Sequence, residues 1–379
     1  MKSSESLFAE ASTISSKDAG LSLDQHLFDL IAEHGHEQVS FASDRHSGYR
    51  GIIGVHNTIL GPALGGTRFW SYESDAEAFI DVLRLSRGMT YKAAVAGLNL
   101  GGGKSVILGD YRTTEREAIM RAHGRHVESL RGRYITAEDV GTSTADMELV
   151  RQETDHVVGL AGRSGDPSPV TAFGTYRGMQ ACAKFRYGDA SLEGKTVAVQ
   201  GCGHVGYYLC KHLHEDGVKL VVADIDERKV KRVVDEFGAQ PVAPDEIYAV
   251  AADIFAPCAL GAVINDATLK VLKVDVVAGA ANNVLAEERH GDLLAERGVT
   301  YAPDYVINSG GLINVNAEVE GWSLDRAHQK AAEIHDTVYN VLEIARDEGI
   351  PSYRAADRLA ERRIAEAATA KGKHFDVGQ

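Results

Sequence analysis

Apolar positions in the first third of the chain alternate between strand-like and helix-like spacing. Residues 38–58 contain two β-rich stretches around a polar turn, which predicts a hairpin. Ser74 and Glu77 then form a candidate capping box, and apolar residues recur at helical spacing from residue 76 to residue 83. We therefore expect a helix that leads towards Lys92.

Strand and helix signals continue to alternate up to residue 142. The stretch KSVILGD follows a run of glycines and predicts a short strand, and Thr114 with Glu117 offers a second capping box. The segment RYITAEDVGT is typical of a strand that ends at Asp139. Because strands and helices alternate, we expect α/β layers.

The second half of the chain contains a strand, a glycine turn, a helix and another strand in KTVAVQGCGHVGYYLCKHLHEDGVKLVVADID. This order is typical of a dinucleotide-binding βαβ unit. A Gly/Pro/Ser loop at residues 159–169 precedes the unit and predicts a domain boundary. Further predicted elements are a helix at residues 170–186, strands in ADIFAPC and VDVVAGA, and helices near residues 324–347 and 353–370.

The length of 379 residues exceeds what a single core usually reaches and predicts two domains. We expect an α/β fold with a first α/β domain at residues 1–160, a Rossmann-type domain at residues 161–349, and a cleft between them. The C-terminal helices, residues 350–379, are expected to return to the first domain.

Composition restricts the class of partner. Hydrophobic content of 44% and charged content of 25% are ordinary for a soluble protein, and no apolar run approaches the roughly 18 residues of a membrane span. The formal net charge of -14 argues against binding to a phosphate backbone. We therefore expect neither a membrane nor a nucleic-acid partner.

The four cysteines include no CxxC pair and do not cluster with histidines at ligand spacing. We expect reduced, buried thiols and no metal site. The N-terminal residues 1–20 carry early acidic residues and no continuous apolar core, so they do not read as a signal peptide. These features predict a cytoplasmic protein with a frayed, Ser-rich extension.

The glycine turn of the βαβ unit has the spacing of a phosphate-binding loop. Its first glycine permits a tight reversal, its second permits close approach of a pyrophosphate, and its third permits close packing of helix on strand. The N-terminus of the following helix attracts phosphate charge. The predicted cofactor-binding loop consists of Gly201, Cys202, Gly203, His204, Val205 and Gly206.

Asp224 closes the next predicted strand about 20 residues further on. Its carboxylate would accept hydrogen bonds from ribose hydroxyls and would repel a 2′-phosphate, which favours NAD over NADP. The alternative is a strand-end carboxylate that only caps a turn. Arg228 and Lys229 leave NADP use open.

Two lysines, Lys92 and Lys104, flank a glycine-rich segment in RGMTYKAAVAGLNLGGGKSVILGD. Because glycine has no side chain, a substrate can approach the backbone of a glycine-rich turn closely. Helical patterning explains neither lysine. Taken alone, each could also be a solvated surface charge.

Motifs spread over most of the chain carry a resemblance to a known family. They are GPALGGTRFW, the two-lysine segment, RYITAEDVGT, GDPSPVTAFG and APDYVINSGGLINV. Through them the sequence resembles the leucine, phenylalanine and valine dehydrogenases, relatives of glutamate dehydrogenase, and most strongly the leucine dehydrogenases. The match runs from about His36 to the 340s.

The resemblance implies NAD-dependent, reversible oxidative deamination of an apolar L-amino acid to a 2-oxo acid and ammonia. It implies that Lys92 holds the substrate α-carboxylate, that Lys104 is the general base acting through a water, and that Asp139 handles protons at the nitrogen. A lysine acts as a base only after losing its proton, which burial and a neighbouring cation favour. Lys92 and Lys104 could be that neighbour for each other. The first domain would bind substrate and mediate assembly into a homo-oligomer, an octamer or a dimer.

The same resemblance assigns further residues to the site. Gly65 and Gly66 are placed in a substrate-facing turn, Asn282 in the substrate site, and Thr171 and Asn308 beside the cofactor. Alternatives remain, because a buried Asn often satisfies backbone groups and a Thr at this position could cap the predicted helix.

The predicted side-chain pocket is apolar. By resemblance Leu64, Ala137, Leu312 and Val315 line it, and Leu64 stands where glutamate dehydrogenases use the lysine of a GPxKGG motif to grip the distal carboxylate. A desolvated unpaired charge costs several kcal/mol, whereas one lost methylene contact costs about 1 to 3 kcal/mol. Ala137 replaces the glycine more common in phenylalanine dehydrogenases and would narrow the pocket. We expect leucine, isoleucine or valine as substrate, with phenylalanine as the alternative.

Two other classes of protein remain open. A nucleotide-sensing protein without chemistry would keep the βαβ unit, but the intact Lys92, Lys104 and Asp139 argue against it. A hydroxy-acid dehydrogenase would need a His general base near a carboxylate in the second domain. We find no comparable pair in the sequence, although it contains 15 histidines.

Overall fold

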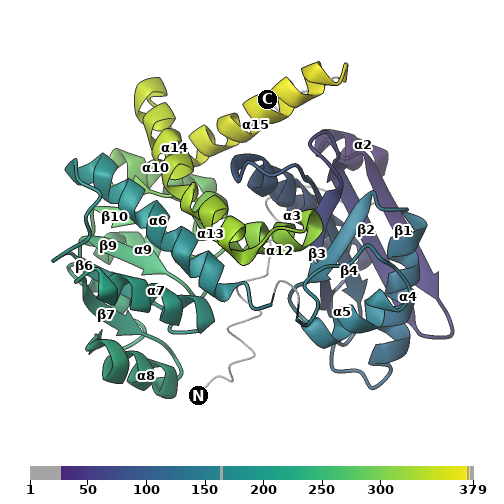
Figure 1. Cartoon of the computed structure of the whole chain (residues 1–379), viewed down its shortest axis with the longest axis horizontal. Coiled ribbons are helices and arrows are strands. Elements are labelled where there is room, and N and C mark those ends of the chain that lie inside the picture. The colour runs from purple at the N-terminus through teal and green to yellow at the C-terminus, as the bar shows by residue number, and fades with distance from the viewer. Residues whose placement is uncertain (1–26, 163–164, 374, 376–379) are drawn as a thin grey trace. The chain divides into compact units, whose positions relative to one another are not determined.

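A computed structural model describes residues 27–162, 165–373 and 375 (Figure 1). The predicted N-terminal extension and two residues of the predicted boundary loop lie outside the described residues. None of the helices described is both long enough and apolar enough to cross a membrane.

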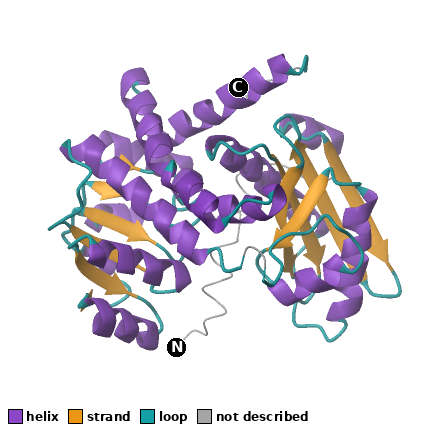
Figure 2. Ribbon diagram, viewed as in Figure 1, coloured by secondary structure: helices purple, strands orange, loops and turns teal. Residues whose placement is uncertain are grey.

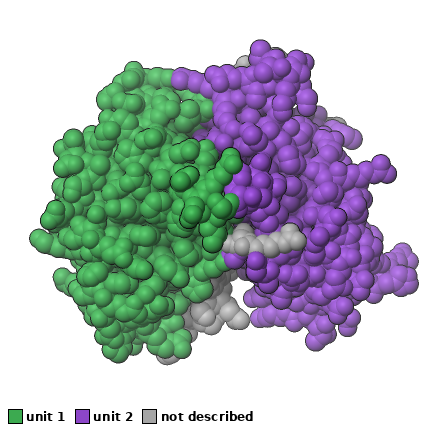
Figure 3. All heavy atoms as spheres, viewed as in Figure 1, with its two compact units in different colours: residues 1–15, 166–314, 323–359 green, residues 16–165, 315–322, 360–379 purple. Residues whose placement is uncertain are grey.

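The chain divides into two units, coloured separately in Figure 3. Unit 1 contains Asp166–Asn314 and Ser323–Leu359. Unit 2 contains the described residues up to Gly165, together with Val315–Trp322 and the segment from Ala360 onwards. The sequence predicted that the chain passes between domains near residues 160 and 350. It gave no sign that a short segment after residue 314 belongs with unit 2.

Unit 2 is built on a five-stranded sheet with the order β1-β2-β4-β3-β5. The first two strands form the predicted hairpin and pair antiparallel, as do β2 and β4, whereas β4, β3 and β5 run parallel. The strands are β1 (Gln38–Asp44), β2 (Tyr49–Asn57), β3 (Ala63–Trp70), β4 (Gly101–Leu108) and β5 (Tyr134–Glu138).

Helices cover both faces of this sheet (Figure 2). Alternate strand residues point to opposite faces, so Ile52 and Val106 join a core cluster with Phe79 of α3, while Ile107 packs with Met120 of α4. The predicted α/β layers are confirmed, because this alternation gives each face of the sheet its own helices. The helices are α2 (Leu27–Glu33), α3 (Asp75–Val95), α4 (Arg116–Ser129) and α5 (Thr144–Arg151).

The two predicted capping boxes have different outcomes. The Ser74 side chain accepts a hydrogen bond from the Glu77 backbone N–H at 3.2 Å, so the predicted start of α3 is confirmed. Thr114 does not cap α4, which follows Glu115 without a side-chain cap. The Thr113 hydroxyl accepts from the Glu115 N–H instead, because the chain makes a separate turn before the helix.

The interpretation of two glycine motifs as turns was only partly right. A turn does follow α3, with Gly97 at φ +69°, but most of the glycines lie in strands. Gly101 opens β4, and Gly65 and Gly66 lie inside β3, a strand that the sequence did not predict. Because glycine is depleted in strands, a segment that contains several glycines is not recognised as a strand from its sequence. A Cβ atom on Gly65 would lie 1.7 Å from the Gly103 carbonyl oxygen, and one on Gly102 would lie 2.1 Å from the Thr90 nitrogen. These glycines allow backbones to pack closely, β3 on β4 and α3 on β4.

Unit 1 is built on a six-stranded parallel sheet with the order β11-β10-β9-β6-β7-β8. Counted from β6, this order is 3-2-1-4-5-6, the doubly wound arrangement of dinucleotide-binding folds. The strands predicted in the βαβ unit and in the two later apolar stretches are confirmed. The strands are β6 (Thr196–Gln200), β7 (Lys219–Ala223), β8 (Gln240–Pro241), β9 (Ile254–Pro257), β10 (Val276–Val277) and β11 (Thr300–Tyr301).

The helices of unit 1 flank this sheet, and the predicted helix near residues 324–347 is two helices, α13 and α14. A core cluster around the fully buried Phe255 packs under α9 and α10. The helices are α6 (Ser168–Tyr187), α7 (His204–Glu215), α8 (Glu227–Phe237), η1 (Ile247–Ala249), α9 (Asp266–Val271), α10 (Glu288–Glu296), α11 (Asp304–Ile307), α13 (Leu324–Ala332) and α14 (Ile334–Glu348).

Two helices, α12 (Gly310–Glu320) and α15 (Ser352–Ala370), continue from unit 1 into unit 2. Within unit 2 the end of α15 packs on the C-terminal turn of α3. Arg363 donates to the Ala94 carbonyl at 2.8 Å, and Tyr91 donates to Glu361 at 2.9 Å. The chain end therefore supports the helix that carries Lys92.

Candidate active site

Lys104 lies in β4 and points to the face of the sheet that α3 covers. It pairs with Gly54 of β2, and a Cβ atom on Gly54 would lie 3.0 Å from the Val82 side chain of α3. Only 6% of Lys104 is exposed, so it is not a solvated surface charge. A buried lysine requires a partner.

The partner of Lys104 is Asp139, the residue after β5. Its backbone is fixed by Thr142, whose hydroxyl accepts from the Asp139 N–H at 2.9 Å and donates to the Thr67 carbonyl at 2.8 Å. Gly141 completes this turn with φ +79°, and a Cβ atom there would lie 2.0 Å from the Phe69 carbonyl oxygen. The motif AEDVGT therefore encodes a turn that aims Asp139 back over the sheet.

Two cations meet at the Asp139 carboxylate. Lys104 Nζ lies 2.7 Å and Arg68 Nε 3.3 Å from the same oxygen, Oδ2. Burial raises the pKa of Asp139, but the Lys104 ammonium, the Arg68 guanidinium and the hydrogen bond from Lys104 outweigh it and lower this pKa to about 2. Asp139 is therefore a carboxylate at neutral pH and accepts the hydrogen bond of the Lys104 ammonium.

Gly66 makes room for Asp139. A Cβ atom on Gly66 would lie 2.6 Å from the Glu138 carbonyl oxygen and 2.8 Å from the Asp139 Cβ. Instead of standing in a substrate-facing turn, Gly66 lies in a strand whose missing side chain lets Asp139 fold over it. Gly65 accepts a hydrogen bond from the buried Tyr134 hydroxyl through its carbonyl, at 2.6 Å.

Three predicted substrate residues of unit 2, Leu64, Gly66 and Ala137, share the face that carries Lys104, whereas Gly65 points to the other face. Leu64 pairs with Gly102, which packs on α3, and Gly66 pairs with Ala137. Residues paired in register point to the same face, so Leu64 and Ala137 both lie on the α3 side. They are 2% and 7% exposed. Lys92 lies half-buried in the last turn of α3.

The remaining predicted pocket residues lie on α12. Leu312 is buried and belongs to unit 1, whereas the half-buried Val315 belongs to unit 2. A pocket formed by all four apolar residues stays a prediction.

The glycine loop lies at the carboxyl end of β6, beside β9, where the strand order of the sheet reverses. Open α/β sheets bind ligands at such a point. Gly201 has φ +101°, and a Cβ atom on Gly206 would lie 1.9 Å from the Gly201 carbonyl oxygen. A Cβ atom on Gly203 would meet no atom within 4 Å. Gly203 precedes α7, so the position that a pyrophosphate would approach is open at the start of a helix.

Asp224 follows β7 and holds the glycine loop. One of its oxygens accepts from the Cys202 N–H at 2.7 Å and the other from the Asp226 N–H at 2.8 Å. The alternative prediction for Asp224, a carboxylate that caps a turn, is therefore met as well, because both of its oxygens accept from backbone N–H groups. Because an ionised carboxylate has about four acceptor positions, two remain for ribose hydroxyls.

The structure brings Asn282 and Asn308 together. Asn308 is 3% exposed, and its amide donates to Asn282 Oδ1 at 2.8 Å and to the Ala280 carbonyl at 3.2 Å. It therefore satisfies backbone and side-chain acceptors. The Thr171 hydroxyl donates to the Pro167 carbonyl at 2.9 Å inside α6, so it does not cap this helix.

Sequence reasoning missed three residues that organise the charged cluster around Lys104 and Asp139: Arg68, Asp81 and Thr142. Arg68 and Asp81 are ion-paired at 2.8 Å. Both interrupt otherwise apolar patterns, Arg68 in TRFW and Asp81 in AFIDVL, and an ionisable residue on a buried face needs a partner. That signal could have identified the pair.

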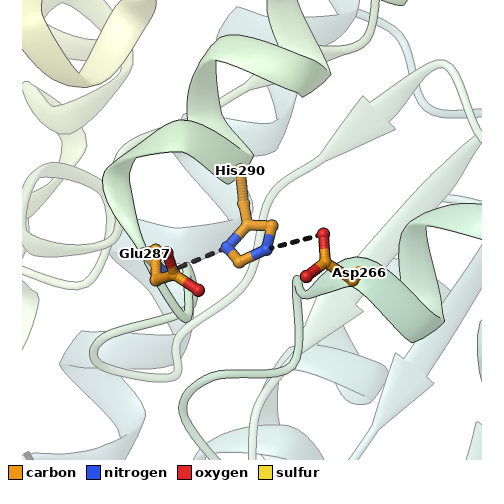
Figure 4. A group of neighbouring side chains, drawn as sticks. All are labelled: Asp266, Glu287 and His290. Carbon is orange, nitrogen blue, oxygen red and sulfur yellow. Dashed lines mark hydrogen bonds and ion pairs between the residues drawn. The ribbon is translucent and has the colours of Figure 1, made fainter. Parts of the chain in front are cut away.

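A third cluster of polar side chains lies in unit 1, at Asp266, Glu287 and His290 (Figure 4). The two carboxylates are already bridged by Arg289, which lies 2.6 Å from Asp266 and 2.9 Å from Glu287. His290 Nδ1 accepts from the Glu287 N–H at 3.0 Å, so a neutral ring carries its proton on Nε2, facing Asp266 at 3.5 Å. Neither ring nitrogen offers a metal a lone pair, and the cluster is an ion-pair network that joins the starts of α9 and α10.

Comparison with known families agrees with this geometry. Residues 36–156 match the model described as "Glu/Leu/Phe/Val dehydrogenase, dimerisation domain". Residues 162–227 and 222–372 match the model described as "Glutamate/Leucine/Phenylalanine/Valine dehydrogenase". Together the two models cover most of the chain.

The individual proteins that this chain resembles are amino-acid dehydrogenases. A leucine dehydrogenase of Thermoactinomyces intermedius is 58% identical over 341 residues, 89% of this chain and 93% of the relative. A valine dehydrogenase of Streptomyces coelicolor is 47% identical over 88% of this chain and 93% of the relative. The crystal structure of L-tryptophan dehydrogenase from Nostoc punctiforme superimposes with a TM-score of 0.83 at 45% identity, covering 90% of this chain and 100% of that one. The chain therefore belongs to the Glu/Leu/Phe/Val dehydrogenase family, and it is an amino-acid dehydrogenase that uses a nicotinamide cofactor.

Proposed function

We propose that the chain catalyses the reversible, NAD-dependent oxidative deamination of leucine, isoleucine or valine to the 2-oxo acid and ammonia. The observation that carries this proposal is the Lys104–Asp139 pair, 2.7 Å apart and on the same sheet face as the apolar Leu64 and Ala137. A distal substrate carboxylate would meet these apolar side chains without a counter-charge. The leucine and valine dehydrogenase relatives support the same substrate class.

The proposed proton chemistry follows from this pair. Loss of hydride from Cα leaves an imine, which water must attack before ammonia can depart. Lys104 takes the proton of the attacking water. Asp139, in contact with Lys104, relays a proton from it to the substrate nitrogen so that ammonia can leave. Lys92, in the last turn of α3, holds the α-carboxylate. A bound nicotinamide supplies the hydride acceptor.

We assign dinucleotide binding to unit 1 and most of the substrate contacts to unit 2. The open position at Gly203 and the doubly wound strand order support a pyrophosphate at the start of α7. Thr171 and Asn308 are proposed to contact the cofactor. The proposed substrate contacts are Gly65, Gly66, Leu64, Ala137, Leu312, Val315 and Asn282.

Asp224 favours NAD over NADP. Its negative charge would repel a 2′-phosphate, and Arg228, a nearby cation, is already paired with Asp226 at 3.0 Å. We expect fluorescence titration to give tighter binding of NADH than of NADPH. Tighter binding of NADPH would contradict the assignment.

We also propose a cytoplasmic homo-oligomer, a dimer or an octamer. All four cysteines are free thiols, which agrees with a reducing compartment. The family model for residues 36–156 is described as a dimerisation domain. Light scattering coupled to size-exclusion chromatography would measure the assembly, and a monomer would contradict the proposal.

The decisive experiment is the initial rate of NADH formation across a panel of L-amino acids that includes leucine, isoleucine, valine, phenylalanine, tryptophan and glutamate. We expect the highest kcat/KM for a branched aliphatic substrate and the lowest for glutamate. Lys104→Ala should lower kcat by about 100-fold or more, since it removes the general base. Full activity in this variant, or a preference for glutamate, would overturn the proposal.

A further inference from the structure

Arg68 connects the proposed catalytic pair to a second buried carboxylate. It lies in β3 with 19% of its side chain exposed, and its two ends bind different acids. Nε lies 3.3 Å from Asp139 Oδ2, and Nη1 donates to Asp81 Oδ2 at 2.8 Å. The planar guanidinium can make both contacts at once because its donors diverge from a rigid fork.

Asp81 fixes the far end of this guanidinium. Asp81 is 5% exposed, and besides Arg68 it accepts from the Tyr72 hydroxyl at 2.7 Å and from Arg84 at 3.0 Å. These three donors come from β3, from the loop after it and from α3. Asp81 therefore holds Arg68 in one orientation.

The charges of this cluster leave one cation unmatched. Arg68 and Arg84 keep their charge at any pH at which the protein folds, and they balance the carboxylates of Asp81 and Asp139. Lys104 carries the surplus charge. When Lys104 gives up its proton, Asp139 still has Arg68 as a counter-ion and is not left as an unpaired charge, which would be costly where water is scarce.

We propose that Arg68 is a positioning residue for the amino-acid dehydrogenase reaction: held by Asp81, it compensates and orients the Asp139 carboxylate so that Lys104 is free to release and recover its proton. This inference rests on the proposed roles of Lys104 and Asp139. Arg68 itself touches Asp139 and makes no proton transfer.

The effect of pH follows from the groups around Lys104 and Asp139. In contact with Asp139 is Arg68 from β3, and behind Arg68 lies Asp81 with its partners Tyr72 and Arg84. Tyr134 of β5 lies on the other face of the sheet and, like Tyr72, acts on Asp139 only electrostatically. Burial lowers the pKa of Arg68, and the charges of Asp139 and Asp81 outweigh this and raise it, so Arg68 stays charged. Removing Arg68 leaves the cluster more negative by one charge, which favours the protonated form of Lys104. The activity limb that rises as Lys104 loses its proton should move to higher pH.

The test is the pH profile of kcat/KM for L-leucine in Arg68→Gln. We expect the rising limb to move upward by about one pH unit, and kcat at pH 8 to fall about tenfold while KM changes by less than about threefold, since Lys92 is unchanged. Arg68→Lys keeps the positive charge and should return the rising limb of the pH profile to its wild-type position. Its kcat should stay lower, because one ammonium cannot reproduce both contacts. Arg50→Gln is the matched control, as it breaks an exposed pair with Asp75 in the same unit.

A second readout is independent of turnover. Competitive labelling of the full-length protein with trace acetic anhydride, followed by mass spectrometry, reports the pH at which the Lys104 amine becomes reactive. The labelling curve should move upward in Arg68→Gln and not in Arg50→Gln. If Arg68→Gln does not fold, the double variant Arg68→Gln with Asp81→Asn removes one charge of each sign. Because Arg68 is the charge in contact with Asp139 and Asp81 lies behind it, a smaller upward movement is expected.

The outcomes separate the inference from the proposed function. If Lys104→Ala and Asp139→Asn lose activity while Arg68→Gln keeps the wild-type pH profile and labelling curve, the role of Arg68 is refuted and the proposed function stands. If Lys104→Ala keeps full activity, the proposed function fails first. An Arg68→Gln variant that changes only thermal stability would also refute the inference, since its role would then be merely structural.

Discussion

The two units carry their functional residues in different ways. In unit 1 the glycine loop is one contiguous segment, Gly201–Gly206, and Asp224 closes the βαβ unit that contains it. In unit 2 the charged cluster is assembled from β3, α3, β4 and the turn after β5, that is, from Arg68, Asp81, Lys104 and Asp139. A local motif can be recognised in the sequence, but an assembled cluster depends on strand order.

The glycines of the two units also serve different neighbours. In unit 2, a Cβ atom on Gly65 would overlap the Gly103 carbonyl oxygen at 1.7 Å, so the missing side chain makes room for another backbone. In unit 1, a Cβ atom on Gly203 would meet no protein atom within 4 Å, so the missing side chain leaves open space. The same residue type therefore serves folding in one unit and, by our proposal, cofactor binding in the other.

The largest effect should come from Gly65→Ala. The added methyl would force β3 away from β4 and disturb the strands that carry Arg68 and Lys104, so we expect a loss of about 3 kcal/mol or more in the free energy of unfolding. Urea denaturation followed by circular dichroism measures it. Gly88→Ala is the control, because Gly88 lies in α3 with open space around its Cβ position and should gain about 0.5 to 1 kcal/mol. Equal stability of the two variants would show that β3 and β4 can separate without cost.

The second-largest effect should come from acid, which should destabilise unit 2 more than unit 1, because unit 2 contains buried, neutral histidines. Burial lowers the pKa of His123 to about 3 and that of His126 to about 4. Both rings bind the hydroxyl of Tyr49, at 3.0 and 2.9 Å, and His123 also contacts Thr67 at 2.9 Å. The unfolded chain takes up these protons near the ordinary value of 6.5, whereas the folded chain does not. Stability is therefore present above pH 6.5 and is lost as the pH falls towards 4.

Each such histidine should cost up to about 2 kcal/mol between pH 6.5 and pH 5. Amide hydrogen exchange at pH 7.5 and pH 5, expressed as protection factors that remove the pH dependence of intrinsic exchange, would locate the loss. We expect protection to fall more in unit 2 than in unit 1. His123→Gln should reduce the difference between the two pH values. An equal fall in both units would argue against a local effect of these rings.

Much of the fold and part of the candidate site were accessible from the sequence. The hairpin, the start of α3 and the βαβ unit were predicted because a local pattern encodes each of them: alternation, a capping serine, a glycine spacing. β3 was missed because two of its eight residues are glycines and its register depends on β4 and β5. Thr114 was misread because a capping residue is effective only where the helix actually starts.

The proposed catalytic residues show the same limit of prediction from local patterns. Lys104 and Asp139 were chosen from motifs, but the distance between them follows from the parallel pairing of β4, β3 and β5, which no local pattern specifies. The only sequence signal for Arg68 and Asp81 is weak: each is a charged residue within an apolar stretch. Their roles emerge only when the sheet brings a strand residue and a helix residue to one carboxylate.

The smallest effect, and the one that isolates unit 1, should come from Gly203→Ala. Because the Cβ position is open and φ is -66°, the variant should fold with the melting temperature of the wild type. If the pyrophosphate approaches this position, the methyl group should weaken NADH binding about tenfold, equivalent to about 1.4 kcal/mol. Fluorescence titration of the two proteins measures this directly, with Gly88→Ala as the matched control. Unchanged affinity would place the pyrophosphate elsewhere, and lower stability would mean that both units use glycine for packing, which would remove the contrast between them.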